Sequence, residues 1–260
     1  MQRNILLTIS FDGSAYHGWQ VQSNACTVQQ VLCDAIKSVT GAFCPVTGCS
    51  RTDTGVHANM FCCCVKTESA ISTQSLPAAL NANLPDDIVV LSAREMPAEF
   101  HARYDCRGKE YVYKIFNSEL RSPFLVNRAL LYKYPLDAEF LDVQARAFLG
   151  THDFSSFCAS GSSVENKIRT VSRVGVAREG DIVTFTVAAD GFLYNMVRIM
   201  VGTLLDISSG KLGADSIPSV ISACNRSAAG VTAPAQGLYL NRVFYDFNLG
   251  ESNNAAGSQK

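Results

Sequence analysis

Hydrophobic and polar positions in the first part of the chain switch between the two-residue period of a strand and the longer period of a helix. The clearest helix begins after Thr27, because its apolar positions share one face and Gln30 follows at the spacing of a capping box. The clearest strand ends at the turn signal formed by Asp12 and Gly13. The pattern predicts strands at residues 5–11, 42–47, 60–65 and 87–95, and helices at residues 28–39 and 74–82.

The rest of the chain repeats this rhythm. Asp137 is placed to cap a helix that runs to Gly150, and a strongly apolar helix ends at Gly210. Small and polar residues predict a disordered tail at residues 249–260. The further predicted strands cover residues 109–117, 168–177, 182–189 and 237–247, and the two later helices cover residues 194–209 and 215–225.

Hairpins interrupt the alternation of strands and helices in both parts of the chain, so a doubly wound parallel sheet does not fit the pattern. The pattern favours an α+β protein of two halves with mainly antiparallel strands. We expect the first half to cover residues 1–104 and the second to cover residues 105–248, with their sheets joined.

Composition is that of an ordinary globular protein, with 47% hydrophobic and 17% charged residues. No apolar segment approaches the ~20 residues of a membrane span, and the N-terminus lacks the pattern of a signal peptide. We therefore expect a soluble, cytoplasmic protein. The net charge of −1 does not indicate a nucleic-acid partner. Residues 101–121 and 161–178 are locally basic, which fits either an RNA-binding face or an ordinary solvated strand face.

The chain has ten cysteines and no C-x-x-C pair. Most of them, such as Cys33, Cys224 and the run at residues 62–64, lie in apolar patterns, which predicts reduced and mostly buried thiols. A metal site built from His57 and the run at residues 62–64 is the alternative. Adjacent strand residues point to opposite faces, so the three cysteines cannot all face one ion. We expect no metal.

Residues 48–58, with the sequence GCSRTDTGVHA, bring three charged or titratable side chains between two apolar, strand-like segments. Arg51 and Asp53 would share a face if this segment is extended. Gly55 supplies a backbone conformation that other residues resist. An aspartate in a loop is most often a turn former or a helix cap, so the pattern alone leaves the role of Asp53 open.

Six segments in order over residues 5–247 resemble the TruA family of tRNA pseudouridine synthases: FDGSAYHGWQVQ, GCSRTDTGVHA, FHARYDCRGKEYVYKIFN, GTHDFSSF, GFLYNMVRIMVGTLL and TAPAQGLYL. The run RTDTGVHA is the most specific of them. The resemblance implies an enzyme that isomerises uridine to pseudouridine in the tRNA anticodon arm, typically at nucleotides 38 to 40, without a cofactor or a metal. It also implies two ferredoxin/RRM-like halves, with helices on one side of the joined sheet and an active-site cleft between the halves.

The same resemblance assigns catalytic roles to Asp53, Arg198 and Tyr111. Asp53 would be the catalytic carboxylate and Arg198 its cationic partner, since an unpaired guanidinium in an apolar helix is costly unless it reaches the surface. Tyr111 would stack on the target uracil and take part in proton transfer, although Tyr113 shares its strand face and either could be plain core. Arg51 would help to extrude the target nucleotide, with a surface ion pair as the alternative.

His57 and Lys109 are further candidates for substrate binding, and His57 could instead satisfy backbone groups of its loop. Gln236 departs from the family, which commonly has histidine there, and this difference affects at most the rim of the pocket. Members of the family act as homodimers, so the resemblance implies a homodimer that binds the tRNA anticodon arm. The candidate phosphate contacts are Lys109, Lys114, Lys167 and Arg169.

Two other classes of protein compete with this assignment. A non-catalytic RRM-like RNA-binding protein would use basic, aromatic strands but would not need Asp53 beside Arg51 in a closed loop. An aspartate-dependent phosphotransferase would need further metal-binding carboxylates or a phosphate loop, and the sequence has no D-x-D and no P-loop. The sequence favours the isomerase and leaves open whether Asp53 attacks C6 of the base or C1′ of the ribose.

Overall fold

The computed structural model describes residues 2–247 and 249. The chain divides into two compact units. Unit 1 comprises the described residues up to Arg107 together with those from Leu240 on, and unit 2 comprises Gly108–Tyr239. The sequence pattern gives no sign that the last strand returns to the first unit, because strand periodicity shows which residues are buried but not which strand lies beside them.

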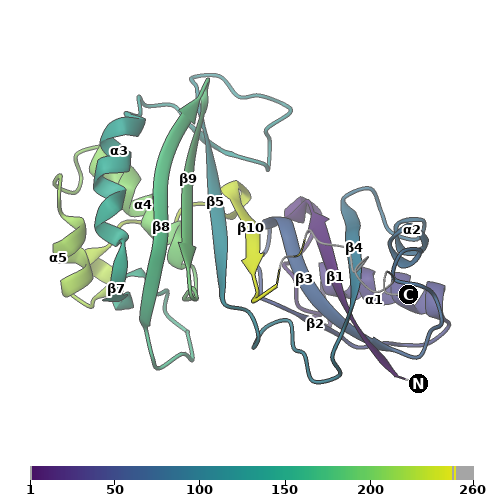
Figure 1. Cartoon of the computed structure of the whole chain (residues 1–260). Helices are drawn as coiled ribbons and strands as arrows, with labels where there is room; N and C mark the ends of the chain where they lie inside the picture. Colours follow the sequence, from purple (N-terminus) through teal and green to yellow (C-terminus); the bar gives the residue numbers. More distant parts are fainter. Residues whose placement is uncertain (1, 248, 250–260) are drawn as a thin grey trace, which may run out of the picture. The chain divides into compact units, whose positions relative to one another are not determined.

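Unit 1 has the connectivity of a split βαβ fold of the ferredoxin type. Its elements are β1 (Arg3–Phe11), α1 (Val28–Thr40), β2 (Val46–Gly48), β3 (His57–Thr67), α2 (Leu76–Asn81), β4 (Ile88–Met96) and β10 (Leu238–Phe244), which enters this unit at Leu240 (Figure 1). The strand order is β4-β1-β3-β10, and β2 pairs with β3. The β1–β3, β1–β4 and β2–β3 pairs are antiparallel. The predicted ferredoxin/RRM-like fold is thus confirmed for this unit.

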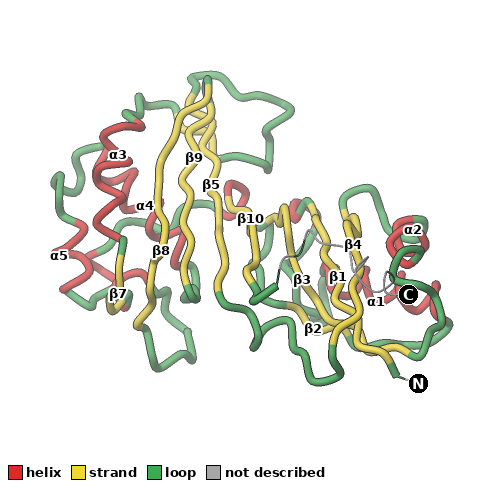
Figure 2. Tube along the Cα trace, in the orientation of Figure 1, coloured by secondary structure: helices red, strands yellow, loops and turns green. Residues whose placement is uncertain are grey.

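Unit 2 repeats this arrangement with additions. Its elements are β5 (Gly108–Asn117), β6 (Leu130–Tyr132), α3 (Ala138–Ala145), β7 (Gly150–Asp153), β8 (Ile168–Glu179), β9 (Ile182–Ala189), α4 (Met196–Ser208) and α5 (Ile217–Ser222). Figure 2 draws the helices in red and the strands in yellow. The strand order is β5-β9-β8-β7, all antiparallel, and β6 pairs with β5 in parallel. The helices α3 and α4 pack on each other and on β8 and β5, respectively. The predicted α+β class is therefore confirmed, while the joining of the sheets and the cleft between the halves stay predictions.

Helix ends follow the predicted capping residues in most places. Thr27 caps α1 by accepting a hydrogen bond from the amide of Gln30 at 3.4 Å. The side chain of Gln30 bonds to Asp34 instead of turning back, so only half of a capping box forms. Gly210 follows α4 with φ of 73°, which is the left-handed conformation expected at that position.

The prediction that the helix after Asp137 runs to Gly150 is wrong. Helix α3 ends at Ala145, a short 3-10 turn follows, and Gly150 opens strand β7. Gly150 has φ of 101°, which turns the chain out of the helical direction. The predicted disordered tail lies outside the described residues, apart from residue 249.

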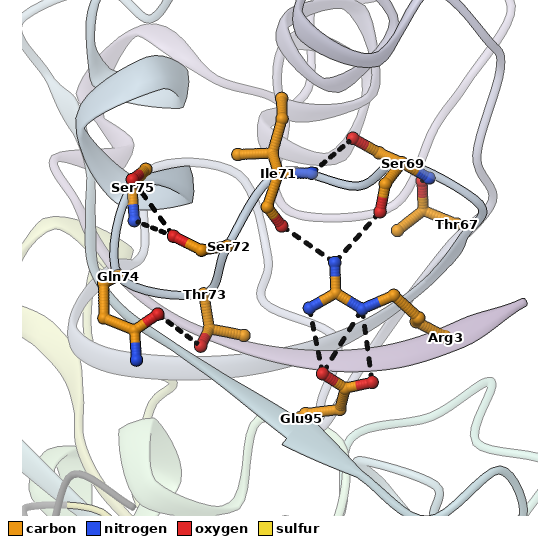
Figure 3. A network of polar contacts seen from close by, with 9 residues as sticks. All are labelled: Arg3, Thr67, Ser69, Ile71, Ser72, Thr73, Gln74, Ser75 and Glu95. Carbon is orange, nitrogen blue, oxygen red and sulfur yellow. Dashed lines mark hydrogen bonds and ion pairs between the residues drawn. The ribbon is translucent and has the colours of Figure 1, made fainter. Parts of the chain in front are cut away.

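Arg3 of β1 fastens the edge strand β4 to the segment before α2 (Figure 3). Its guanidinium donates to Glu95 of β4 at 2.9 Å and to the carbonyl oxygens of Ser69 and Ile71 at 2.9 and 2.8 Å. The bond to Glu95 raises the pKa of Arg3 and lowers the pKa of the carboxyl group. Because Glu95 is half-exposed, this pair contributes at most about 1 kcal/mol, and its main effect is to fix the direction of the loop.

All ten cysteines have free thiols, and among the described residues no group of three or more His, Cys, Asp or Glu side chains is arranged to hold a metal ion. The predicted burial is confirmed for Cys33 and residues 62–64, but Cys224 is exposed. Cys224 has a positive φ of 45° just after α5 and leaves the apolar face of that helix. Nor does the described part of the chain contain a helix with the length and apolar character that a membrane crossing requires.

Thiol reactivity should divide the cysteines sharply. Burial raises the pKa of the Cys63 thiol and raises that of Cys64 to about 11, so both stay protonated and unreactive at pH 8. We expect an aromatic disulfide reagent to modify the exposed Cys26 and Cys224 quickly and residues 62–64 only after unfolding. Mass spectrometry of the labelled peptides checks this, and a Cys26→Ser, Cys224→Ser double variant should lose the fast phase. Rapid native labelling of Cys63 would contradict it.

Candidate functional site

The loop between β2 and β3 holds Asp53 in a fixed backbone conformation. Asp53 is half-buried, and its carbonyl oxygen accepts a hydrogen bond from the amide of Val56 at 3.1 Å. Gly55 has φ of 76°, as its predicted role requires, and its amide donates to the carbonyl of Tyr16 at 3.2 Å. The loop is therefore held both by its own turn and by the segment after β1.

Two glycines after β1 let that segment lie directly against the Asp53 loop. A Cβ atom on Gly13 would overlap the carbonyl oxygen of Val56, and one on Gly18 would overlap the carbonyl oxygen of Thr52. The amide of Trp19 donates to the same Thr52 oxygen at 3.2 Å. The close approach explains why the motif FDGSAYHGWQ accompanies the Asp53 loop, a relation that sequence periodicity could not reveal.

His57 lies at the start of β3 and is 1% exposed. Its Nδ1 accepts a hydrogen bond from the amide of Gly13 at 3.0 Å and lies 3.1 Å from Oδ1 of Asp12. Since Nδ1 has one lone pair, it cannot accept from Gly13 and donate to Asp12 together, and the well-aligned amide bond places the ring proton on Nε2. The geometry supports the structural alternative for His57, and its contact with RNA stays a prediction.

Strand β5 in unit 2 carries the two candidate tyrosines, and the structure distinguishes them. Tyr113 is fully buried, and its hydroxyl donates to the carbonyl of Pro234 at 2.7 Å. Burial raises the pKa of Tyr113, so it stays protonated and serves as a packed core residue. Tyr111 is 7% exposed, and its ring meets Phe192 edge-on, with ring centroids 4.9 Å apart. Of the two, Tyr111 remains the candidate for contact with a base.

Arg198 is the third residue of α4 and is half-buried. Its Nε donates to the carbonyl of Ala233 at 2.7 Å, and its Nη1 donates to Oδ1 of Asn195 at 2.8 Å. Asn195 precedes the helix in a left-handed conformation, with φ of 60°. These hydrogen bonds fix the direction of the guanidinium. The alternative, in which Arg198 extends freely into solvent, does not fit this geometry.

The segment TAPAQG anchors both Arg198 and Tyr113, since their partners Ala233 and Pro234 are consecutive. A Cβ atom on Gly237 would lie 2.6 Å from the ring of Tyr113, so a glycine is needed for this contact. Gln236 lies in the short 3-10 turn of the same segment. The role of this motif in positioning Arg198 was not predictable from hydrophobic patterning, because the residues are about 35 positions apart.

The predicted phosphate contacts lie in two strands of unit 2 or beside one of them, since Arg169 belongs to β8 and Lys167 directly precedes it. Lys109 and Lys114 lie in β5, and Nζ of Lys114 lies 4.3 Å from the ring centroid of Tyr239. Arg169 donates from Nη1 to the carbonyl oxygens of Asn166 and Ile168, at 2.9 and 2.6 Å. That these residues contact RNA stays a prediction. Arg51 and Asp53 lie in one loop of unit 1 and His57 follows at the start of β3, whereas Tyr111 and Arg198 belong to unit 2.

Replacing Gly18 by alanine should disturb the Asp53 loop. Alanine is strained at φ of 80°, and its Cβ would overlap the Thr52 oxygen, so we expect a loss of about 2–3 kcal/mol of stability and at least about tenfold in catalytic rate. Gly41→Ala is the matched control, because Gly41 has a similar φ of 76° and no atom within 4 Å of its added Cβ. Denaturant unfolding and single-turnover rates measure both effects. Equal behaviour of the two variants would show that the overlap is unimportant.

The fold defines the class of the protein as α+β, with a ferredoxin-like unit that carries Arg51 and Asp53 in one rigid loop. The sequence model of a family described as tRNA pseudouridine synthase matches residues 7–105 and 144–246. The chain belongs to this family.

Similar proteins cover nearly the whole chain. A protein named tRNA pseudouridine synthase A from Acetivibrio thermocellus is 49% identical over 243 residues, which are 94% of this chain and 100% of the relative. Proteins of the same name from a Thermoanaerobacter species and Halalkalibacterium halodurans are 46% and 44% identical, over 94% and 92% of this chain and 100% and 92% of theirs. A chain in a solved Cbf5–Nop10–Gar1 complex is 11% identical, with a TM-score of 0.36 over 92% of this chain and 59% of that one, a likeness too weak to establish a shared fold.

Proposed function

We propose that this protein isomerises uridine to pseudouridine at nucleotides 38 to 40 in the anticodon arm of tRNA. The observation that carries the proposal is the RTDTGVHA loop, in which Asp53 is held by two glycine-dependent backbone contacts in a chain that belongs to the tRNA pseudouridine synthase family. Isomerisation leaves the composition of the nucleotide unchanged, so the net reaction consumes no electron donor and no co-substrate.

The reaction breaks one bond to the ribose and makes another. The bond from N1 of uracil to C1′ breaks, the uracil turns within the site, and C5 bonds to C1′ while the C5 proton leaves and N1 gains a proton. Asp53 supplies the nucleophilic carboxylate for bond cleavage, and attack on the base or on the sugar would use the same side chain. The target nucleotide must leave the stack before Asp53 can reach it.

Three further residues have proposed roles around Asp53. Arg198 is its cationic partner, a role that its hydrogen bonds to Ala233 and Asn195 support by fixing the direction of the guanidinium. Tyr111 stacks on the uracil, since Tyr113 is committed to Pro234. Arg51 helps to extrude the target nucleotide, because a planar guanidinium pairs with phosphate and stacks on bases.

The direct experiment is to map pseudouridine in unmodified tRNA after incubation with the purified protein. Carbodiimide adducts that stop reverse transcription should appear at nucleotides 38 to 40 of substrate tRNAs and nowhere else. Modification confined to another arm would overturn the assignment of the anticodon arm. Tight tRNA binding without any pseudouridine would favour a non-catalytic RNA-binding protein, for which the structure offers no specific support.

We further propose that the protein is a cytoplasmic homodimer. Support comes from the loop between β5 and β6, where Leu120, Phe124 and Val126 are 78%, 82% and 52% exposed. Three exposed apolar side chains in one loop are typical of an interaction site. A second copy would also extend the set of basic residues along which a long RNA partner could bind.

Substitution in this loop should separate the subunits. We expect Phe124→Ser to shift the protein from dimer to monomer in light scattering, because it removes one of the largest exposed apolar side chains of the loop. Phe43→Ser, at a phenylalanine of unit 1 that is 70% exposed, should leave the dimer unchanged. A wild-type protein that is monomeric and fully active at assay concentrations would contradict the proposed dimer but not the proposed reaction.

A further inference from the structure

A cavity of about 260 Å³ opens beside Arg51 within unit 1. This volume approaches the lower end of the range for small-ligand sites. The residues that matter for its chemistry are Trp19, Gly48, Arg51, His101, Arg103 and Tyr104. His101, Arg103 and Tyr104 belong to the motif FHARYDCRG, and the proposed reaction assigns no role to them.

His101 and Tyr104 form a rigid aromatic step at the cavity. Their rings stack with centroids 4.2 Å apart and an interplanar angle of 29°, and Tyr104 is 77% exposed. Nδ1 of His101 accepts hydrogen bonds from the amides of Arg103 and Tyr104 at 3.1 and 3.3 Å, and Asp105 accepts the amide of His101 at 2.8 Å. Because the turn is fixed by these bonds, the exposed ring of Tyr104 needs little ordering when a ligand stacks on it.

Two guanidinium groups lie at the same cavity. Arg51 and Arg103 are both exposed, and in the part of the chain that the structure describes neither guanidinium has a hydrogen-bond or ion-pair partner. Unpartnered guanidinium groups beside an exposed aromatic ring match the two halves of a nucleotide, its phosphate and its base. An acidic peptide would engage the guanidinium groups but leave the ring of Tyr104 unused.

The rest of the lining is rigid as well. Trp19 is buried and stacks on Phe61 with ring centroids 4.1 Å apart. A Cβ atom on Gly48 would lie 2.7 Å from Nε1 of Trp19, so only glycine lets the indole take this position. Gln29 is fixed by a hydrogen bond from its Nε2 to the carbonyl of Val46 at 2.8 Å. The part of the cavity wall that Trp19, Gly48 and Gln29 form is therefore preformed.

We propose that this cavity is a second nucleotide subsite, which binds an unpaired RNA nucleotide near the target uridine by stacking its base on Tyr104 and pairing its phosphate with Arg51 and Arg103. Arg51 precedes Asp53 by two residues, a separation of at most ~7 Å of extended chain, so the bound nucleotide is a close neighbour of the target. Extruding the target unstacks its neighbours, and the ring of Tyr104 replaces the lost stacking. The position of the nucleotide relative to the target rests on the proposed function.

Steady-state kinetics with tRNA test the role of Tyr104. Base–aromatic stacking of the usual strength predicts that Tyr104→Ala raises KM by about 5- to 100-fold while kcat changes less than about threefold. Tyr104→Phe keeps the ring and should behave as wild type. Phe43→Ala removes an aromatic ring that is 70% exposed and lies outside the cavity, and it should have no effect. Unchanged KM in Tyr104→Ala, or an equal loss in Tyr104→Phe, would overturn the subsite.

Binding measurements separate this inference from the proposed reaction. Anticodon stem-loop RNAs with 2-aminopurine at each loop position in turn would be bound to Asp53→Asn protein, which needs no turnover. We expect fluorescence quenching at one position near the target, which is lost when Tyr104→Ala is added to Asp53→Asn. No Tyr104-dependent quenching at any position overturns the subsite, whereas quenching by a protein whose wild type makes no pseudouridine overturns only the proposed reaction.

Charge removal tests the phosphate half of the subsite. Arg103→Gln should reduce the slope of log affinity against log salt by about 0.7, the value for one contact to single-stranded RNA. Lys66→Gln removes an exposed charge of unit 1 outside the cavity and should leave the slope unchanged. Equal slopes for wild type and Arg103→Gln would exclude a phosphate contact by Arg103.

Discussion

Asp53→Asn should lower the rate of pseudouridine formation by more than about 10³-fold and leave tRNA affinity within about threefold of wild type. The amide keeps the shape of the side chain but has no negative charge and is a poor nucleophile, so the cleavage step fails. Affinity is expected to survive because it is the sum of many phosphate contacts, to which one carboxylate adds nothing. Single-turnover rates and filter binding with the same tRNA measure the two quantities.

Asp34→Asn is the matched control for this variant. Asp34 lies on the exposed face of α1 in the same unit, where it accepts hydrogen bonds from Gln30. Both substitutions remove one negative charge, so any general effect of charge on RNA affinity should appear equally in the two proteins. If Asp53→Asn retained a tenth or more of wild-type activity, Asp53 would not be the nucleophile, and the function of the loop would have to be sought in binding.

The long elements of the fold follow from hydrophobic period alone. Strand β1 and helix α1 lie within two residues of their predicted bounds, because each buries a continuous apolar face over at least nine residues. The short strands β6 and β7 have three and four residues, too few to establish a period, and the pattern does not predict them. The prediction of a helix as far as Gly150 is wrong for a related reason. The apolar periodicity continues through the 3-10 turn at Arg146–Phe148, so the pattern does not show where the α-helix ends.

In the candidate site, too, the sequence predicts features within one short segment but not contacts between residues far apart in the chain. Asp53 and Arg51 could be selected because motif and spacing lie within one short loop. The glycine contacts from Gly13 and Gly18 to that loop, and the cavity beside Tyr104, join residues about 35 or more positions apart. A single sequence carries no record of such contacts. The choice between Tyr111 and Tyr113 needed a further observation, the bond from Tyr113 to Pro234, since both share one strand face.

Arg198→Lys should reduce kcat by at least about 100-fold, even though the charge is kept. The guanidinium already donates from Nε to Ala233 and from Nη1 to Asn195, and in the proposed mechanism its remaining donors stabilise the Asp53 carboxylate. The single ammonium group of lysine cannot meet three partners in these directions. The shorter-range, undirected contact of a lysine ammonium would stabilise the Asp53 carboxylate less than the guanidinium does, so the carboxylate of the variant should protonate more readily. The remaining activity of the variant should therefore rise with pH over a range where wild-type activity is already constant.

Arg226→Lys provides the control, because Arg226 is also an arginine of unit 2 that bonds to backbone, at the carbonyl oxygens of Ala229 and Gly230. It should lose some stability but less than about threefold in kcat, which would separate a structural loss from a catalytic one. Measuring kcat from pH 5 to 9 for both variants, together with their denaturant midpoints, decides the matter. If Arg198→Lys matched Arg226→Lys in rate and in pH profile, Arg198 would be a structural residue of the α4 terminus, and the cation beside Asp53 would have to be another side chain.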